Sequence, residues 1–268
     1  MWEQYDIDWT LHPDVNILAG INGSGKSTLL RILEFALSDD DEPALPNLHH
    51  LFHAIEISGE GIHIKMTGDA VVEWKNDYGF GIINTLDEAI HGNYVRALFK
   101  ETPSPLSSYM NAIVFDTEAR SLNNYRLKAT ENPVERHRID HLQQWVATVN
   151  SFFATTQKTL VMEGHEVFFK QANGTSLGLD SLSSGEKKLL IILIKALVQD
   201  ERPSILLMDE PEMSLDIDWQ YRLVDAIRTI NPACQLIIAT HSPAIFGDGW
   251  NDKLFFMEDI LKEDILKE

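Results

Sequence analysis

The sequence has 268 residues, of which 44% are hydrophobic and 24% are charged, and its formal net charge is −19. Length and apolar content are sufficient for a sizeable core, and we expect one domain made of two lobes. The acidic excess predicts that direct nucleic-acid binding is weak or absent, because proteins bind the phosphate backbone through Lys and Arg side chains that displace its counterions. No stretch approaches the roughly 18 unbroken apolar residues of a membrane span, so no membrane association is expected. A single cysteine, Cys234, excludes an intrachain disulfide and favours a cytoplasmic protein.

The first half of the chain predicts strands that lead into and follow a glycine-rich turn. A strand at 15–19 runs into this turn, and the apolar spacing after it predicts an amphipathic helix at 27–37. Alternating apolar residues around a Gly-Glu-Gly turn predict an antiparallel hairpin. The other segments that we expect in this half are a strand at 5–9, hairpin strands at 54–57 and 62–66, a strand at 70–74 and a buried strand at 111–115.

The second half alternates helical and strand patterns. Helices are predicted at 139–153, at 184–198 and through Trp219, Leu223, Ile227 and Ile230, with alternating strand residues at 160–169 and buried strands at 205–208, 236–239 and 254–256. Strands that alternate with helices in this way are typical of a mainly parallel sheet. The fold class is therefore predicted to be α/β, with an antiparallel portion from the hairpin.

The glycine-rich turn carries a phosphate-binding motif. Its spacing, G-x-x-x-x-G-K-[ST], lets successive backbone N–H groups point at a β-phosphate at the positive end of the following helix. Lys26 is expected to reach the β- and γ-phosphates, and the Ser27 hydroxyl to complete the shell of a Mg²⁺ ion. The residues that we predict to contact the nucleotide, ATP, are Asn22, Gly23, Ser24, Gly25, Lys26, Ser27 and Thr28.

Two carboxylates follow the buried strand at 205–208. A strand of this kind delivers them to the edge of the sheet where α/β folds bind ligands. We expect Asp209 to hold Mg²⁺, directly or through water, and Glu210 to polarise the water that attacks the γ-phosphate.

The segment Leu182-Ser183-Ser184-Gly185-Glu186 opens the helix at 184–198. Backbone N–H groups and the Ser183 hydroxyl are therefore aimed at an anion. Taken alone, the pattern is also that of a simple helix cap, with Ser183 before Glu186. The motifs that follow favour a second interpretation, in which these residues cover the γ-phosphate held by a second subunit.

Two further segments complete the pattern. Ser214-Leu215-Asp216 follows Glu210 at the spacing of a loop that touches the partner subunit, and Asp216 is its candidate contact residue. His241 ends a buried strand, where an imidazole can hydrogen-bond the γ-phosphate and orient the attacking water. Trp2, Tyr5 and Trp9 are candidates for adenine stacking, with core packing as the alternative.

The order G-x-N-G-S-G-K-S-T, L-S-S-G-E, D-E-P-E, S-L-D and A-T-H-S-P resembles the ABC-type ATPases of the SMC, RecF and OLD (overcoming-lysogenization-defect) group. From about residue 139 to 250 the sequence looks closer still to ATPase subunits of anti-phage systems, such as the PtuA-like proteins of Septu and retron systems. The resemblance implies a P-loop NTPase of the ABC-type ATPase head class, with a mainly parallel sheet and a helical signature lobe. Such heads form an ATP-dependent homodimer or higher oligomer around two nucleotides.

The resemblance also implies a division of the single domain, residues 1–268. We expect a nucleotide-binding lobe at about 1–75, 109–120 and 201–257, an insertion at 76–108, a helical signature lobe at 121–200 and an acidic tail at 258–268. The glutamine that joins the Mg²⁺ shell in relatives has no evident counterpart. Asp116, Thr117 and Glu118 follow the strand at 111–115, and Gln143 and Gln144 fall inside a predicted helix.

Three functional hypotheses follow. The favoured one is an ATP-driven switch, in anti-phage defence, that acts on a separate effector protein such as a nuclease, because the sequence holds no nuclease motif of its own. The second is a DNA-repair or chromosome-associated ATPase that acts on DNA. The third is a scaffold that senses ATP without hydrolysing it.

Overall fold

The computed structural model describes residues 5–37, 54–60, 62–67, 70–76, 79–83, 105–116, 121–131, 137–200, 203–247 and 249–263. Within these residues no helix is both long and apolar enough to cross a membrane. The chain divides into two compact units. The first comprises Met1–Asn84, Arg202–Pro211 and Gln235–Glu268, and the second comprises Thr85–Glu201 and Glu212–Cys234.

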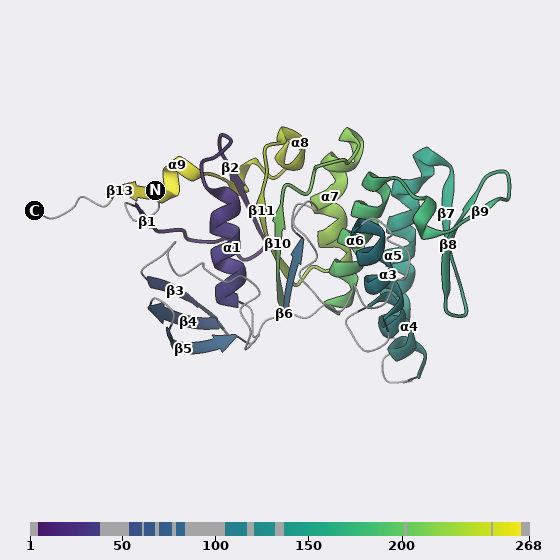
Figure 1. Cartoon of the computed structure of the whole chain (residues 1–268), viewed down its shortest axis with the longest axis horizontal. Coiled ribbons are helices and arrows are strands. Elements are labelled where there is room, and N and C mark those ends of the chain that lie inside the picture. The colour runs from purple at the N-terminus through teal and green to yellow at the C-terminus, as the bar shows by residue number, and fades with distance from the viewer. Residues whose placement is uncertain are drawn as a thin grey trace, which may run out of the picture. The chain divides into compact units, whose positions relative to one another are not determined.

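A five-stranded sheet forms the centre of the first unit (Figure 1). Its strands, in spatial order, are β12 (Leu254–Phe256), β2 (Val15–Ala19), β11 (Cys234–Ala239), β10 (Ser204–Asp209) and β6 (Gly79–Ile83). β2 pairs in parallel with β11 and β12, and β10 pairs in parallel with β6. Every residue of β2 and β10 is buried, as the near-continuous apolar sequence of a parallel strand leads one to expect. These pairings confirm the predicted α/β class with a mainly parallel sheet.

Helix α1 (Lys26–Leu37) packs between this sheet and a smaller antiparallel one. The smaller sheet contains β3 (Ala54–Gly59), β4 (Ile62–Thr67) and β5 (Ala70–Asn76). Leu29 and Leu30 of α1 share one apolar core with Leu207 of β10 and Ile64 of β4. This core fixes the start of α1, and with it the glycine-rich turn, against the end of β2.

The C-terminal segment of the described chain returns to this unit. After α8 (Pro243–Phe246), the 3-10 turn η5 (Asn251–Lys253) and β12, the chain forms α9 (Met257–Ile260) and β13 (Leu261–Glu263), which pairs antiparallel with β1 (Tyr5–Ile7). Met257 and Ile260 are buried in the core. The stretch that we expected to be an acidic tail from residue 258 thus begins with folded elements, because apolar residues in it find a core to cover.

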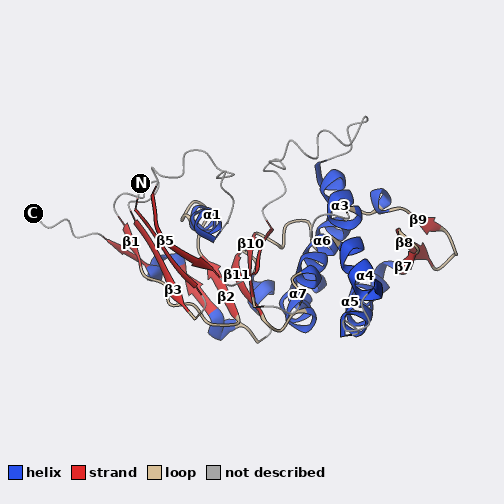
Figure 2. Ribbon diagram, turned by 90° about the horizontal axis from the view of Figure 1, so that it is seen from below, coloured by secondary structure: helices blue, strands red, loops and turns tan. Residues whose placement is uncertain are grey.

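The second unit is mainly helical, and α5, α6 and α7 pack against one another in it (Figure 2). Its helices are α3 (Pro105–Phe115), α4 (Leu122–Glu131), α5 (His137–Phe153), α6 (Ser184–Val198) and α7 (Ile217–Ile230). A small antiparallel sheet contains β7 (Lys158–Glu163), β8 (Glu166–Gln171) and β9 (Ser176–Leu177), with 3-10 turns η3 (Ala154–Thr156) and η4 (Leu179–Ser181) beside it in sequence. The Phe153 ring at the end of α5 stacks on Phe169 of β8 at a centroid distance of 4.4 Å.

Two expectations about residues 76–115 were wrong. Residues 111–115 are the last part of α3 in the second unit, and not a strand of the nucleotide-binding lobe. Met110, Ile113 and Val114 are buried at the spacing of a helix face. The apolar run at 111–115 is too short for its periodicity to distinguish a helix from a buried strand. Residues 79–83, which we placed in an insertion, form β6 of the main sheet.

Candidate functional site

The glycine-rich turn joins β2 to α1 in the first unit. Gly23 has a φ of 78° and Gly25 a φ of 102°, which residues with a side chain rarely adopt. The Ser24 N–H donates to the Ile21 carbonyl at 3.2 Å, and the Leu29 N–H donates to the Gly25 carbonyl at 2.9 Å as the helix begins. The turn therefore has the backbone form that a phosphate-binding motif requires.

Lys26 lies inside this turn and is only 4% exposed. Its Nζ donates to the carbonyls of Gly20 at 3.0 Å and Ile21 at 3.1 Å. A phosphate oxygen is a stronger acceptor for an ammonium group than a neutral carbonyl, because the bond is then between opposite charges. The side chain is thus already at the turn where the predicted phosphates would lie.

Ser27 and Asp209 meet where α1 begins and β10 ends. The Ser27 Oγ lies 3.1 Å from the Asp209 Oδ1 and donates to it. Hydroxyl and carboxylate oxygens are the hard ligands that Mg²⁺ prefers, and two protein ligands beside phosphates and water are typical of nucleotide-bound Mg²⁺. No group of three His, Cys, Asp or Glu side chains that could hold a metal by itself occurs in the described part of the chain. The residues present therefore fit a Mg²⁺ ion that nucleotide phosphates help to hold.

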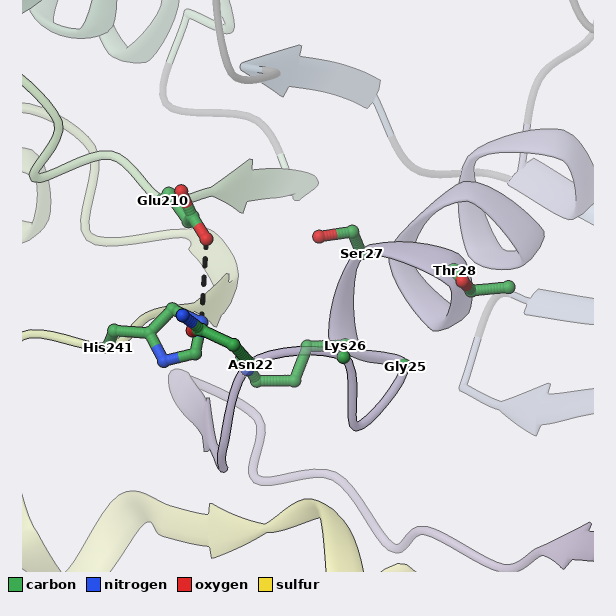
Figure 3. A pocket seen from close by; sticks show the side chains of 8 residues that line it. Asn22, Gly25, Lys26, Ser27, Thr28, Glu210 and His241 are labelled. Carbon is green, nitrogen blue, oxygen red and sulfur yellow. Dashed lines mark ion pairs between the residues drawn. The ribbon is translucent and has the colours of Figure 1, made fainter.

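The side chains of Glu210 and His241 point toward each other beside the glycine-rich turn (Figure 3). The Glu210 Oε1 lies 3.5 Å from the His241 Nε2. Glu210 has a φ of 44°, an unusual left-handed backbone for a non-glycine residue, and its N–H donates to the Ala239 carbonyl at 2.8 Å. This backbone bond fixes the end of β10 beside the end of β11, so the two side chains come from adjacent strand ends.

The pocket formed here has a volume of about 300 Å³. Its lining brings together most of the residues that we predicted in the first unit: Asn22, Gly23, Gly25, Lys26, Ser27, Thr28, Glu210 and His241. Ser24 does not line the pocket, and its buried Oγ has no hydrogen-bond partner in the structure.

Trp9, a candidate for adenine stacking, packs edge-on against Phe255 at a centroid distance of 5.5 Å, which favours core packing over adenine stacking for this ring. Trp2 and the Tyr5 side chain lie outside the described residues.

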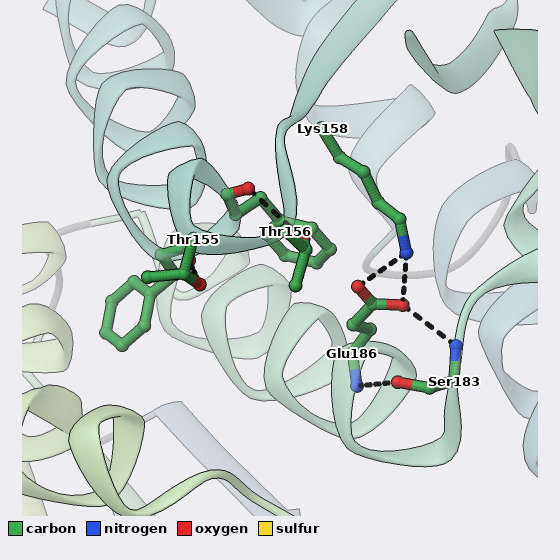
Figure 4. A network of polar contacts seen from close by, with 7 residues as sticks. Thr155, Thr156, Lys158, Ser183 and Glu186 are labelled. Carbon is green, nitrogen blue, oxygen red and sulfur yellow. Dashed lines mark hydrogen bonds and ion pairs between the residues drawn. The ribbon is translucent and has the colours of Figure 1, made fainter. Parts of the chain in front are cut away.

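The L-S-S-G-E turn lies in the second unit and has a capping box (Figure 4). The Ser183 Oγ accepts from the Glu186 N–H at 3.2 Å, and the Glu186 Oε2 accepts from the Ser183 N–H at 2.9 Å. Ser183 and Ser184 are exposed, whereas Gly185 and Glu186 are buried. The two serines are thus free to meet a ligand, while the Glu186 carboxylate is turned into the protein and we now expect it to shape the turn.

Sequence reasoning missed the partner of Glu186. Lys158 Nζ at the start of β7 lies 2.6 Å from the Glu186 Oε1 and 2.8 Å from the Oε2. Burial raises the pKa of the Glu186 carboxyl, but the hydrogen bonds from Lys158 and Ser183 and the attraction of Lys158 outweigh burial, so the net pKa is lowered. No local pattern could have revealed this pair, since its members are 28 residues apart.

The loop before α7 approaches the same turn. Gly185 leaves no room for a Cβ atom, because the carbonyl oxygen of Ser214 occupies that space. Asp216 is exposed and caps α7, with its Oδ1 accepting from the Asp218 N–H at 3.0 Å. The second unit therefore brings Asp216 and the L-S-S-G-E turn onto neighbouring loops. Of the candidates for the glutamine of the Mg²⁺ shell, Gln144 lies on α5 and donates to the Thr229 carbonyl at 3.2 Å, and residues 117–118 lie outside the described part.

A family model described as "AAA domain, putative AbiEii toxin, Type IV TA system" matches residues 85–247, which is more than half of the chain. The chain belongs to this family. Membership confirms the predicted recognition of an ATPase of the SMC/RecF-like group, at the level of a phosphate-loop ATPase. The matched residues include the L-S-S-G-E turn, the two carboxylates after β10 and His241, and they begin after the glycine-rich turn.

This AAA-domain chain is also similar to solved SMC head structures. The SMC head domain from Thermotoga maritima is 15% identical, with 89% of this chain and 84% of that chain covered, at a TM-score of 0.47. The Smc head domain with an extended coiled coil, bound to the C-terminal domain of ScpA and derived from Pyrococcus furiosus, is 13% identical, with 88% and 86% covered, at a TM-score of 0.49.

Proposed function

We propose that this chain is an ABC-type ATPase head that binds ATP with Mg²⁺ and hydrolyses it when two copies close around two nucleotides. The observation that carries the proposal is the pocket of the first unit. Its lining includes Lys26, Ser27, Glu210 and His241, and Asp209 accepts a hydrogen bond from Ser27. The Glu210 carboxylate, 3.5 Å from the His241 ring, can act on a water molecule. A site that only bound phosphates would have no use for the Glu210 carboxylate, which carries the same charge as the phosphates.

The proposed chemistry divides among these side chains. Lys26 binds the β- and γ-phosphates, and Ser27 and Asp209 hold Mg²⁺, which neutralises charge on the phosphates when bound. Glu210 accepts a proton from the attacking water and orients it toward the γ-phosphate. His241, 3.5 Å from Glu210, donates a hydrogen bond to the γ-phosphate oxygens, where charge shifts during the reaction.

A second copy would complete the site. All the lining residues of the pocket come from the first unit, whereas the exposed Ser183, Ser184 and Asp216 belong to the second. The Ser183 Oγ accepts a hydrogen bond within its own turn, so its hydroxyl hydrogen remains to donate to an oxygen of the γ-phosphate. We infer that ATP bridges the pocket of one copy and the L-S-S-G-E turn of the other.

We further propose that closure acts on a separate effector protein in anti-phage defence. The family description names a toxin of a toxin–antitoxin system, which supports a defence role. A DNA-acting ATPase is less well supported: the net charge of −19 opposes DNA, and the buried guanidinium of Arg138 donates to the Asp200 carboxylate at 2.8 Å, so this cation is already paired within the protein. The Glu210–His241 pair speaks against a scaffold that does not hydrolyse ATP.

The test compares the wild type with Glu210→Gln. We expect steady ATP turnover in the wild type and turnover slowed by orders of magnitude in the variant, with nucleotide affinity preserved, because positioning survives while the base is lost. The variant should elute as a larger species with ATP and Mg²⁺ than with ADP. Ser183→Arg in that background should block the shift, whereas Ser176→Arg, at an exposed position on β9, should not. An assembly that is indifferent to nucleotide would contradict the proposal.

A further inference from the structure

The ion pair between Lys158 and Glu186 joins the start of β7 to the L-S-S-G-E turn. The Lys158 Nζ contacts both carboxylate oxygens, at 2.6 and 2.8 Å. The two side chains are only 14% and 5% exposed. A pair this enclosed has a fixed geometry, unlike a surface pair whose long side chains exchange partners.

One oxygen of the Glu186 carboxylate accepts two hydrogen bonds. The Glu186 Oε2 accepts from Lys158 and also from the Ser183 N–H. Lys158 therefore fixes the orientation of the group that holds Ser183 (Figure 4). Rotation of that carboxylate would release the Ser183 N–H, so Ser183 would keep only the bond from the Glu186 N–H to its Oγ.

Capping alone does not require the ion pair. A neutral glutamine at position 186 can accept from the Ser183 N–H as a carboxylate does, so the cap needs neither the charge nor Lys158. Burial penalises that charge and raises the pKa of the Glu186 carboxyl, and a partner ammonium must offset the penalty. The chain thus contains a charged pair where an uncharged cap would suffice.

The elements that the pair joins are anchored without it. The Leu160 N–H of β7 donates to the Asn150 Oδ1 at 2.7 Å. On α6, the Lys187 Nζ donates to the Ser107 Oγ and to the Asp180 carbonyl, each at 2.9 Å. Attachment of β7 or α6 is therefore an insufficient explanation of the Lys158–Glu186 pair.

We propose that Lys158 is a positioning residue for the ATP-dependent contact between two copies: its ion pair to Glu186 holds the turn in the form in which Ser183 and Ser184 receive the γ-phosphate bound by the second copy. This inference rests on the proposed function, and it names a residue from outside the predicted motifs. Lys158 itself does not touch the nucleotide in this proposal, since its ammonium is paired with the Glu186 carboxylate.

The test uses the full chain in the Glu210→Gln background. Lys158→Met removes the charge and keeps the length of the side chain, Lys158→Arg keeps the charge, and Lys158→Met/Glu186→Gln removes both charges while retaining a capping side chain. The matched control is Lys170→Met, at a lysine that is 48% exposed on the neighbouring strand β8. Sedimentation measures the dissociation constant of the ATP-induced dimer, and calorimetry at low protein concentration measures ATP affinity.

We expect Lys158→Met to weaken the dimer by roughly tenfold or more, the effect of losing one well-placed interaction, with ATP affinity unchanged. Lys158→Arg should restore most of the loss, and Lys170→Met should have no effect. The double variant separates positioning from stability, because it leaves no unpaired charge in the protein: its melting temperature should recover while its dimer stays weak. Recovery of both would overturn the proposal and assign the pair a purely structural role.

A second readout is independent of dimerisation. Hydrogen exchange in the nucleotide-free chain should be faster at the Ser183 amide in Lys158→Met than in Lys170→Met, because the acceptor of that amide is no longer held. Equal exchange would also overturn the proposal. If the Glu210→Gln parent does not dimerise with ATP, the proposed function fails, and the exchange measurement still decides whether Lys158 positions the turn.

Discussion

The carbonyl oxygen of Ser214 lies against the Cα of Gly185, in the space that a Cβ atom would occupy there. Ser214 has a φ of 68°, a left-handed backbone that is unusual for a residue with a side chain. The residue after next, Asp216, caps α7. The L-S-S-G-E turn and the Ser214–Asp216 loop therefore touch through backbone atoms.

Gly185→Ala should lower the free energy of unfolding by about 1–3 kcal/mol, the usual cost of forcing an extra carbon into packed structure. The obstacle is a backbone carbonyl, which cannot rotate away as a flexible side chain could. Urea denaturation measures the change. The matched control is Gly178→Ala, because nothing lies within 4 Å of a Cβ atom at Gly178.

Equal stability of Gly185→Ala and Gly178→Ala would mean that the Ser214 carbonyl gives way at no cost. The close approach of the Ser214 carbonyl to Gly185 would then contribute nothing to stability.

The pocket at the glycine-rich turn was predictable because the residues that form it belong to short sequence motifs. The G-x-x-x-x-G-K-[ST] spacing determines the turn before α1, and four buried apolar residues before Asp209 determine where β10 ends. Parallel strands that end at one edge then bring Asp209, Glu210 and His241 together. Short-range pattern and sheet topology were sufficient for this half of the site.

The same reasoning failed where partners are far apart or where periodicity is short. Lys158 has no motif around it, and only the fold brings it to Glu186. Residues 111–115 are five in number, too few to tell a buried strand from the end of a helix. Gly185 stays a predicted ligand contact, but the reason why glycine is needed there, the Ser214 carbonyl, is not revealed by any spacing rule.

Lys26→Ala should weaken ATP binding by roughly 100-fold or more. Hydrogen bonds to charged groups contribute about 1.5–3 kcal/mol each, and Lys26 is expected to contact two phosphates. Calorimetry with ATP and Mg²⁺ measures the change. Lys65→Ala, which removes a lysine that is 48% exposed on β4, is the control for loss of one positive charge. Equal affinity of Lys26→Ala and the wild type would refute the phosphate-binding assignment.

His241→Ala should lose most turnover, with little change in ATP affinity. The contact that we assign to His241 matters chiefly while charge moves onto the γ-phosphate oxygens, so it lowers the barrier more than it aids binding. Steady-state kinetics gives kcat, and calorimetry gives the affinity. A kcat equal to that of the wild type would make His241 a structural residue at the end of β11.

Asp209→Asn should remove the benefit of Mg²⁺ for nucleotide binding. In the wild type, ATP affinity should fall when EDTA removes Mg²⁺, because Ser27 and Asp209 then lose the ion that links them to the phosphates. In Asp209→Asn the affinity should be low with and without Mg²⁺. An undiminished response to Mg²⁺ in this variant would place the ion on other residues.

Acid should weaken the Lys158–Glu186 pair in a defined direction. The pKa of the Glu186 carboxyl is lower in the folded chain than its ordinary value of 4.5. The pair therefore contributes its full stability above that ordinary value, and loses it as the pH falls through the folded-state pKa. The wild type should unfold with a higher free energy than Glu186→Gln at pH 7. This difference in the free energy of unfolding should shrink below about pH 4.5, where a protonated glutamic acid resembles glutamine.

Urea denaturation at pH 7, 5 and 3.5 measures the difference. The control for loss of one acidic group is Glu163→Gln, at a side chain that is 64% exposed. A difference between wild type and Glu186→Gln that stays constant from pH 7 to 3.5 would show that the charge on Glu186 contributes nothing, and the cap alone would then hold the turn.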